Sequence, residues 1–352
     1  MPVRLKDIAK DLGLSVVTIS KVLRHHDDIG DETRERVLAR VKELNYRPNL
    51  AARSLVTGRS YLIGLVVPDL LHPFFAEVAK ALSTALRKKG YSLIISSSEE
   101  DPELEEQQID HLLGRQLDAL IIASSRKTGE PSHRVENQVT PYILIDREFV
   151  GFPASFVGID DEAAGILATD HLIAVGCERI AHIRGPEISP GIRRFEGYKK
   201  SLAQHGMQFH AEYVVAERTA DVQSRQQGAE GMRRLLSVQP PPDGVFCYND
   251  PMAMGAIDTT LEAGLNVPRD IAIIGCGNLH YDDSLRVPLS SIDQQSQQIG
   301  ERSARLAMSI IAAKTPPRRR RIILDPSLVV RASTARTDKA RLPPETTRTT
   351  SE

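Results

Sequence analysis

Residues 5–23 read LKDIAKDLGLSVVTISKVL and predict two short helices around a tight turn. Ile8 and Leu12 are four residues apart and share one face of the first helix. Gly13 follows where that helix would stop, because glycine takes a positive φ at no steric cost. Ser15 can cap the second helix, whose apolar face is Ile19, Val22 and Leu23. Such a pair can place a helix in the major groove of DNA, and an ordinary helical hairpin shows the same pattern.

The next segment predicts a third helix, from about Asp31 to Leu44, with Asp31 as its cap. Its apolar face is formed by Val37, Leu38, Val41 and Leu44. Pro48 ends it, because the residue before a proline avoids the helical region. We therefore expect a three-helix head over residues 1–47, followed by a short helix and linker over residues 48–60.

Charge is distributed unevenly along the 352 residues, although the net charge is only −1. Residues 1–60 hold 12 Lys and Arg against 8 Asp and Glu, whereas the remainder holds 33 against 38. A basic first module on an acidic body fits DNA binding by the first module only, and a solvated helix surface could show the same excess. The composition, 41% hydrophobic and 26% charged, is that of an ordinary globular protein.

The three cysteines, Cys177, Cys247 and Cys276, have no paired spacing and lie in or beside apolar segments. We expect them to be small buried hydrophobic residues rather than disulfides or metal ligands. No apolar run reaches the length of a membrane span, and the N-terminus has no secretory signal. A cytoplasmic protein without a cofactor or metal is therefore expected.

The body alternates apolar strands with amphipathic helices, first over residues 61–145 and again after residue 157. The expected strands are 61–68, 92–96, 119–123, 142–145, 179–183, 213–215, 245–247 and 271–275. The expected helices are 74–89, 103–115, 161–175, 193–205, 222–236, 252–263 and 297–313. Such alternation indicates parallel sheets covered on both faces, and two runs of it predict two doubly wound α/β lobes with a ligand cleft between them.

The end of the chain departs from this alternation. Arg318–Arg321 precede two short apolar segments, 322–324 and 327–330, so they form either a phosphate patch or an exposed edge or lobe crossing. The core is expected over residues 61–333, with crossings between lobes near 160, 291 and 323. Residues 334–352 lack large apolar side chains and are expected to be disordered.

Several short motifs follow the head motif in a fixed order: Tyr46-Arg47-Pro48-Asn49, Ala52-Arg53-Ser54-Leu55, Pro68-Asp69, Pro73-Phe74-Phe75, Ile145-Asp146-Arg147, Asn249-Asp250, Met252-Ala253, Gly255 and Leu328–Arg331. With this ordered set, residues 4–332 resemble the LacI/GalR family of bacterial transcription regulators. The resemblance implies a helix-turn-helix head, a hinge helix and a core like periplasmic sugar-binding proteins. It also implies a homodimer that binds double-stranded DNA at a pseudopalindromic operator, and no membrane partner.

The resemblance places Val16, Val17 and Lys21 at the positions that read bases. Two valines can contact thymine methyl groups, and Lys21 can donate to guanine O6 or N7. Alternatively, Val16 is buried in the head. Ser15, Thr18 and Ser20 are expected at phosphates, with capping an equal role for Ser15.

Leu55 matches the family's intercalating leucine, which wedges a base step and kinks the duplex. Asn49, Ala52 and Arg53 are the other hinge residues expected at the DNA, and a plain interdomain linker is the weaker alternative.

The resemblance also implies a carbohydrate effector bound between the lobes. The matching residues are His72, Phe74, Phe75, Asp146, Arg147, Arg194, Asp250 and Gln294, with Arg193 as the fallback for Arg194. Aromatic rings can stack on sugar faces, Asp accepts from hydroxyls and Arg donates to oxygens. Core packing is the alternative for the two phenylalanines, and surface salt bridges for the charges.

Gly277 departs from the family, because many members carry Asp there. A sugar or a sugar acid is favoured as the effector.

The predicted function is a sequence-specific transcriptional regulator, and we expect the ligand to relieve repression. The alternative is a cytoplasmic sugar-binding protein or an enzyme with an accessory DNA-binding head. Gly275-Cys276-Gly277 is only a fragment of a dinucleotide motif, and no catalytic constellation is readable, so a non-enzyme is expected.

Overall fold

The computed structural model describes residues 3–23, 27–46, 54, 58–126, 140–149, 154–217, 219, 221–313 and 318–336. Its contacts divide the chain into two units, Met1–Ser60 and Tyr61–Glu352. The hinge residues Asn49, Ala52, Arg53 and Leu55, and residues 337–352 of the predicted tail, lie outside the described residues.

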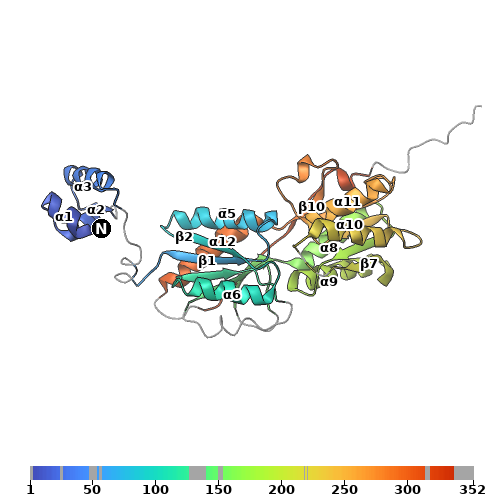
Figure 1. The fold of residues 1–352 in the computed structure, drawn as a ribbon. Helices are drawn as coiled ribbons and strands as arrows, with labels where there is room; N and C mark the ends of the chain where they lie inside the picture. Colours follow the sequence, from blue (N-terminus) through green and yellow to red (C-terminus); the bar gives the residue numbers. More distant parts are fainter. Residues whose placement is uncertain are drawn as a thin grey trace, which may run out of the picture. The chain divides into compact units, whose positions relative to one another are not determined.

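The head consists of α1 (Leu5–Leu12), α2 (Val16–Leu23) and α3 (Asp31–Glu43) (Figure 1). Gly13 ends α1 in the left-handed conformation, with φ +64°, as its position in the sequence predicts. The three helices close around one small core, made of Ile8, Ala9, Ile19, Val22 and Val37. The head is therefore a packed three-helix unit that presents α2 as a separate short helix.

Two details of α3 differ from the expectation. Gly30, with extended backbone, is the N-cap, and Asp31 is the first helical residue, where its charge favours the helix dipole. Leu38 is 40% exposed, because the face of α3 that packs inward is centred on Val37.

The first lobe of the core is a six-stranded parallel sheet in the order β11-β5-β4-β3-β1-β2. Its strands are β1 (Leu62–Val67), β2 (Ser92–Ser97), β3 (Ala119–Ile122), β4 (Tyr142–Ile145), β5 (Ser155–Ile159) and β11 (Arg321–Leu324). Helices α5 (Pro73–Arg87) and α12 (Ser296–Ala312) cover one face, and α6 (Pro102–Leu113) covers the other (Figure 1). Arg321 belongs to an edge strand, which is one of the two expected roles of the arginine run.

The second lobe has the strand order β12-β10-β9-β8-β6-β7, in which only β12 is antiparallel to its neighbour. Its strands are β6 (Ile180–Arg184), β7 (Val214–Ala216), β8 (Gly244–Cys247), β9 (Ala272–Gly277), β10 (Ser290–Asp293) and β12 (Ser327–Val329). Its helices are α8 (Asp161–Ala174), α9 (Ser189–Gln204), α10 (Ser224–Leu236) and α11 (Asp250–Glu262), with short 3-10 turns at Ala211–Tyr213, Asp282–Ser284 and Ala332–Thr334. The predicted class, a helical head with a two-lobed parallel α/β core, is confirmed.

Within the described residues, the chain passes between the two lobes three times. The passages are the single residue Asp160 between β5 and α8, residues 294–295 between β10 and α12, and residues 325–326 between β11 and β12. Because these short segments join the lobes, any movement of one lobe against the other must be absorbed close to them.

Glycines let the helices of the second lobe approach each other closely. A Cβ on Gly165 of α8 would lie 2.2 Å from the carbonyl oxygen of Arg194, and one on Gly197 of α9 would lie 2.1 Å from that of Glu162. Gly228 and Gly255 make the same reciprocal contact between α10 and α11, at 2.0 and 1.9 Å. These backbone contacts leave no room for a side chain, so the glycines fix the positions of the helices.

Some elements differ from the sequence prediction. Strands β5 and β10 were not predicted, and α9 begins at Ser189, four residues before the expected start, with Pro190 in its first turn. Residues 334–336 are ordered rather than disordered: Thr334 is buried, and Arg336 Nη2 donates to Asp243 O at 2.6 Å. All three cysteines are free and buried, as expected. Within the described ranges, none of the helices has the length and apolarity that a bilayer crossing requires.

Candidate DNA-reading helix and effector cleft

The side chains predicted to read bases are on the surface of α2. Val16 is 45% exposed and Val17 is 62% exposed. The apolar interior of the head is filled instead by Ile19 and Val22, so Val16 is not the buried residue that the alternative required. Ser15 Oγ accepts from the backbone N–H of Thr18 at 3.0 Å, which is the capping role. The N-terminal half of α2 thus presents two apolar side chains to solvent.

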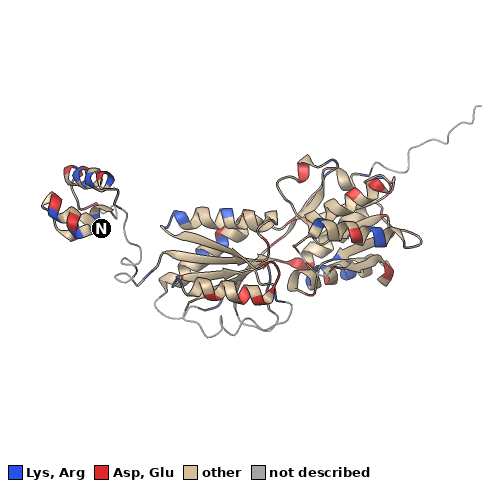
Figure 2. Ribbon diagram, viewed as in Figure 1, with Lys and Arg blue, Asp and Glu red and all other residues tan. Residues whose placement is uncertain are grey.

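Lys21 lies one turn further along α2 and is paired with Asp28 in the unbound head. Both side chains are substantially exposed, 35% and 54%, so the pair is weak and the ammonium can exchange to DNA. Ser20 and Thr18 are half-buried beside it. Figure 2 shows that α3 carries both signs of charge, so the head's excess of positive charge is not a uniform basic face.

Lys21→Ala is expected to weaken specific operator binding by about 1–3 kcal/mol and to relax the preference at one base pair. The stability of the head should hardly change, because an exposed pair contributes about 0–1 kcal/mol. Binding to operator and to scrambled DNA, measured by fluorescence anisotropy, checks this. Lys10→Ala, which removes the same charge from α1, is the control, and equal losses for the two variants would contradict base reading by Lys21.

In the core, Arg147 lies just beyond the carboxyl end of β4 and is 3% exposed. It donates from Nη1 to Ser124 O at 3.0 Å and from Nη2 to Glu100 Oε1 at 3.1 Å, and it contacts Asp221. Glu100 belongs to the first lobe and Asp221 to the second. Arg147 therefore links the lobes across the cleft through carboxylates that the sequence prediction did not include.

Asp146 precedes Arg147 and adopts a positive φ of +59°, a conformation that Asp tolerates better than most residues. Its Oδ2 is 3.7 Å from Arg147 Nε, beyond hydrogen-bond distance. Burial raises the pKa of Asp146, and the charges of Arg147 and Arg194 oppose that rise. The Asp146 carboxylate is thus a buried acceptor that lies near the Arg147 guanidinium without a hydrogen bond to it.

His72 is 5% exposed at the N-terminus of α5. Burial, with the charge of Arg147, lowers its pKa to about 3, so the ring is neutral. Asn249 Nδ2 donates to Nε2 at 3.3 Å, which assigns the ring proton to Nδ1. That Nδ1 has no hydrogen-bond partner among the described residues. His72 therefore offers a buried, unused donor.

Arg194, on α9, is the most completely bonded of the predicted residues and is 1% exposed. It donates to three different segments: Nε to Asp161 Oδ1 at 2.9 Å, Nη1 to Tyr248 O at 2.7 Å and Nη2 to Gln294 Oε1 at 2.8 Å. Its guanidinium carbon also lies 4.7 Å from the centre of the Tyr248 ring. Asp161 follows the passage at Asp160, and Gln294 belongs to the passage at residues 294–295. Arg194 therefore bonds to residues at two of the passages between the lobes.

Arg193, the fallback, points elsewhere. It is 37% exposed and pairs with Glu148 of the first lobe at 2.5 Å.

Phe74 and Phe75 are each 2% exposed and belong to the main hydrophobic core. Their rings meet edge to face, with centroids 5.0 Å apart, and Phe75 contacts His72 in the same way at 5.8 Å. Both side chains therefore pack in the core, which is the alternative to sugar stacking, and Phe75 lies against the His72 ring.

Asp250 is fully buried, and its carboxylate faces the protein. Oδ1 accepts from the Ser291 hydroxyl at 2.6 Å, and Oδ2 shares the backbone N–H of Leu279 with Asp282. A Cβ on Gly277 would lie 2.5 Å from Asp250 Oδ2. In this chain a side chain at position 277 would need Asp250 to move, and Gly277 has a positive φ that favours glycine. Asp250 thus holds β9 and β10 together, and a direct effector contact remains a prediction.

Asp282→Asn is expected to stabilise the core increasingly as the pH rises. Burial and the adjacent Asp250 raise the pKa of Asp282 far above its usual range. The folded state therefore keeps a proton that the unfolded chain releases above about pH 4, so wild-type stability falls with rising pH. Asn does not titrate. Thermal unfolding at pH 5, 7 and 9 should show a widening advantage for the variant, and parallel curves would contradict the raised pKa of Asp282.

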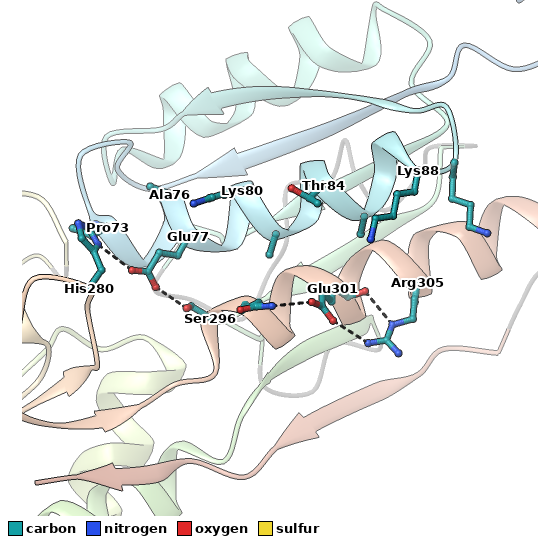
Figure 3. A pocket seen from close by; sticks show the side chains of 14 residues that line it. Pro73, Ala76, Glu77, Lys80, Thr84, Lys88, His280, Ser296, Glu301 and Arg305 are labelled. Carbon is teal, nitrogen blue, oxygen red and sulfur yellow. Dashed lines mark hydrogen bonds and ion pairs between the residues drawn. The ribbon is translucent and has the colours of Figure 1, made fainter.

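Two grooves open near these residues. One of 860 Å³ is lined by Asp69, His72, Asp221 and Tyr281 and by residues of α10 and α11, so it reaches the side chains of His72 and Asp221. The other, also 860 Å³, lies between α5 and α12 (Figure 3). There Glu77 accepts from Ser296 Oγ at 2.7 Å and lies 3.2 Å from His280 Nδ1. None of the predicted effector residues lines this second groove.

Sequence reasoning missed several residues of the cleft. Asp221 follows β7 in a loop without a motif, and Glu100 lies just beyond β2. Asp161 was predicted only as the start of a helix, and Tyr248 only as the end of a strand, with no part in effector binding. The available signal was their position, because polar residues just beyond parallel strands meet at one edge of the sheet.

Comparison with known proteins identifies the family to which this chain belongs. Residues 4–49 match the family model for bacterial regulatory proteins of the lacI family, and residues 169–334 match that for a periplasmic binding protein-like domain. The ribose operon repressor of Halalkalibacterium halodurans is 33% identical over 331 residues, 94% of this chain and 96% of that protein. The chain belongs to the LacI family. A repressor named PurR from Mannheimia succiniciproducens is 31% identical, over 94% of this chain and 98% of its own length.

Solved structures support the same assignment. A lac repressor dimer bound to operator and an anti-inducer matches with a TM-score of 0.82 and 27% identity, over 95% of this chain and 99% of that one. This LacI-family member is therefore a transcriptional regulator that joins a helix-turn-helix DNA-binding head to an effector-binding core. Its homologues are regulators rather than enzymes. LacI-family repressors bind operator DNA and small effectors and form dimers.

Proposed function

We propose that this regulator is a repressor released from its operator by a small hydroxylated effector, which binds between the lobes beside Asp146, Arg147 and Arg194. The observation that carries the proposal is the bonding of Arg194 to Asp161, Tyr248 and Gln294. A ligand that competes for any of these bonds changes the segments that join the lobes. Names of relatives, such as the ribose operon repressor, favour a sugar or a sugar derivative.

Operator recognition is assigned to α2. The exposed methyl groups of Val16 and Val17 suit apolar contact with thymine, and Lys21 suits one polar contact with guanine. In a dimer, the two heads would read two related half-sites, which predicts a pseudopalindromic operator. The hinge would add indirect readout through Leu55, by kinking the duplex between the half-sites.

Effector and operator are coupled through the core in this mechanism. If the effector favours one arrangement of the lobes and DNA favours another, each ligand weakens the other by the same factor, typically about 1–3 kcal/mol. The passages at Asp160 and residues 294–295 are where this difference is absorbed.

Leu55→Ala tests the DNA-binding half of the proposal. The variant is expected to lose operator affinity because the wedge is removed, while effector binding to the core is unchanged. Operator affinity by gel shift and ligand binding by thermal shift are the two measurements. Unchanged operator affinity would contradict the wedge assignment.

A further inference from the structure

The buried and half-buried groups around the cleft hold more negative than positive charge. Among the described residues they comprise five carboxylates and two guanidinium groups, which we call the cleft cluster: Asp69, Glu100, Asp146, Asp161, Asp221, Arg147 and Arg194. Acidic segments are visible where the two lobes meet (Figure 2). His72 is neutral and does not offset the excess. The formal charge of the cluster is therefore negative, and it stays negative when Asp221, whose pKa burial raises to about 8, is protonated.

Both arginines are already paired with carboxylates of the protein, so neither is available to pair with an anionic ligand. Arg147 already contacts Asp221 and Glu100 and has Asp146 at 3.7 Å, and Arg194 is bonded to Asp161 at 2.9 Å. An anionic ligand would have to displace these carboxylates and would leave them buried and unpaired, which is strongly unfavourable. Phosphorylated and carboxylated effectors are disfavoured on this ground.

The unused polar atoms suit a hydroxyl group. Arg147 Nε is buried without a hydrogen-bond partner in the described part of the chain, and Asp146 Oδ2 lies 3.7 Å from it. A hydroxyl can donate to the carboxylate and accept from the guanidinium at the same time, which neither a purely cationic nor a purely anionic group can do. His72 Nδ1 is a further unused buried donor of the cleft.

We infer that the effector carries hydroxyl groups and no negative charge, and that an amine-bearing polyol binds more tightly than its neutral parent. The inference rests on the proposed function, since it names the ligand class of that same site. Of the two effector classes expected from the sequence, a sugar and a sugar acid, it retains the sugar and excludes the sugar acid.

The titration of the cluster agrees with this ligand class. Burial raises the pKa of Asp69 and of Asp146 and raises that of Asp161 to about 6, so holding these groups ionised is costly. An ammonium group placed among them would favour their ionised forms. The groove bounded by Asp69, His72 and Asp221 supplies a route from solvent.

The experiment uses the full-length chain and matched triplets of aldoses. Each triplet holds an amino sugar, its neutral parent and the corresponding sugar acid, across hexoses and pentoses. Binding is followed by thermal shift and quantified by calorimetry. We expect the amine-bearing member of the best triplet to bind about tenfold more tightly than the neutral one, and the acid not to bind. A tighter acid, a tighter neutral parent, or no binding by any amine-bearing member would overturn the inference.

Variants separate failure of this inference from failure of the proposed site. Asp221→Asn should reduce the preference for amine over neutral sugar about tenfold, whereas Glu212→Gln, at an exposed carboxylate paired with His210, should leave it unchanged. Every binder is also tested on Asp146→Asn. An acid that binds best to wild type but not to Asp146→Asn overturns the charge inference and leaves the site intact. A ligand that binds both proteins equally contradicts the site itself.

Discussion

Arg194→Ala is expected to lower the free energy of unfolding of the core by about 3–5 kcal/mol and to abolish the effect of the effector on operator binding. The loss is large because three bonds disappear at once and Asp161 becomes a buried carboxylate without its cation. The Tyr248 carbonyl and the Gln294 amide lose their donor as well. Chemical denaturation and operator titrations with and without effector measure the two effects.

Arg193→Ala is the matched control, since it removes the same side chain one residue earlier. Arg193 is 37% exposed, so the loss of its ion pair with Glu148 of the first lobe should cost at most about 1 kcal/mol and change the effector response far less than the loss of the buried Arg194. Similar behaviour of the two variants would contradict the assignment of Arg194 to the cleft. Should Arg194→Ala fail to fold, Arg194→Lys retains the charge and tests whether the three-way bonding is needed.

Gly165→Ala is the substitution with the second largest expected effect. The added methyl would lie 2.2 Å from the carbonyl oxygen of Arg194, so α9 must move away from α8. We expect a loss of about 1–3 kcal/mol in unfolding free energy from overpacking. The effector response should also weaken, because the side chain of Arg194 must reach Asp161 at the start of the same helix that the methyl pushes away.

Gly114→Ala is the control for this prediction. Its Cβ would have only an ordinary contact, 3.5 Å from Asp110 O, and its φ of −59° suits alanine. Thermal unfolding of both variants checks the difference. Equal stability of Gly165→Ala and wild type would show that α8 and α9 are not held at the distance described.

Most helices and strands could be predicted because each depends mainly on residues next to one another in the sequence. Continuous apolar runs gave the parallel strands, and Gly13 gave the end of α1. Strand β10, Ser290–Asp293, has only one large apolar residue, Ile292, and is recognisable only from its neighbours β9 and β12. The early start of α9 had a local signal, Pro190, that was not used.

The cleft was less predictable, because its partners are distant in sequence. Arg147 and Asp221 are 74 residues apart, and Arg194 and Gln294 are 100 apart. The family resemblance pointed to Asp146, Arg147, Arg194 and Gln294, which the structure places where the two lobes meet. It could not reveal that Asp250 faces inward and accepts from the Ser291 hydroxyl, since that contact joins residues 41 positions apart.

The most direct test of the account is the reciprocity of effector and operator binding in the wild type and in Asp146→Asn. A sugar that raises the melting temperature of the core should weaken operator binding by about 5–150-fold, and operator should weaken sugar binding by the same factor. Asp146→Asn should lose both effects together while retaining operator affinity without ligand. If the sugar still releases Asp146→Asn from operator as it does the wild type, the effector does not act through this cleft.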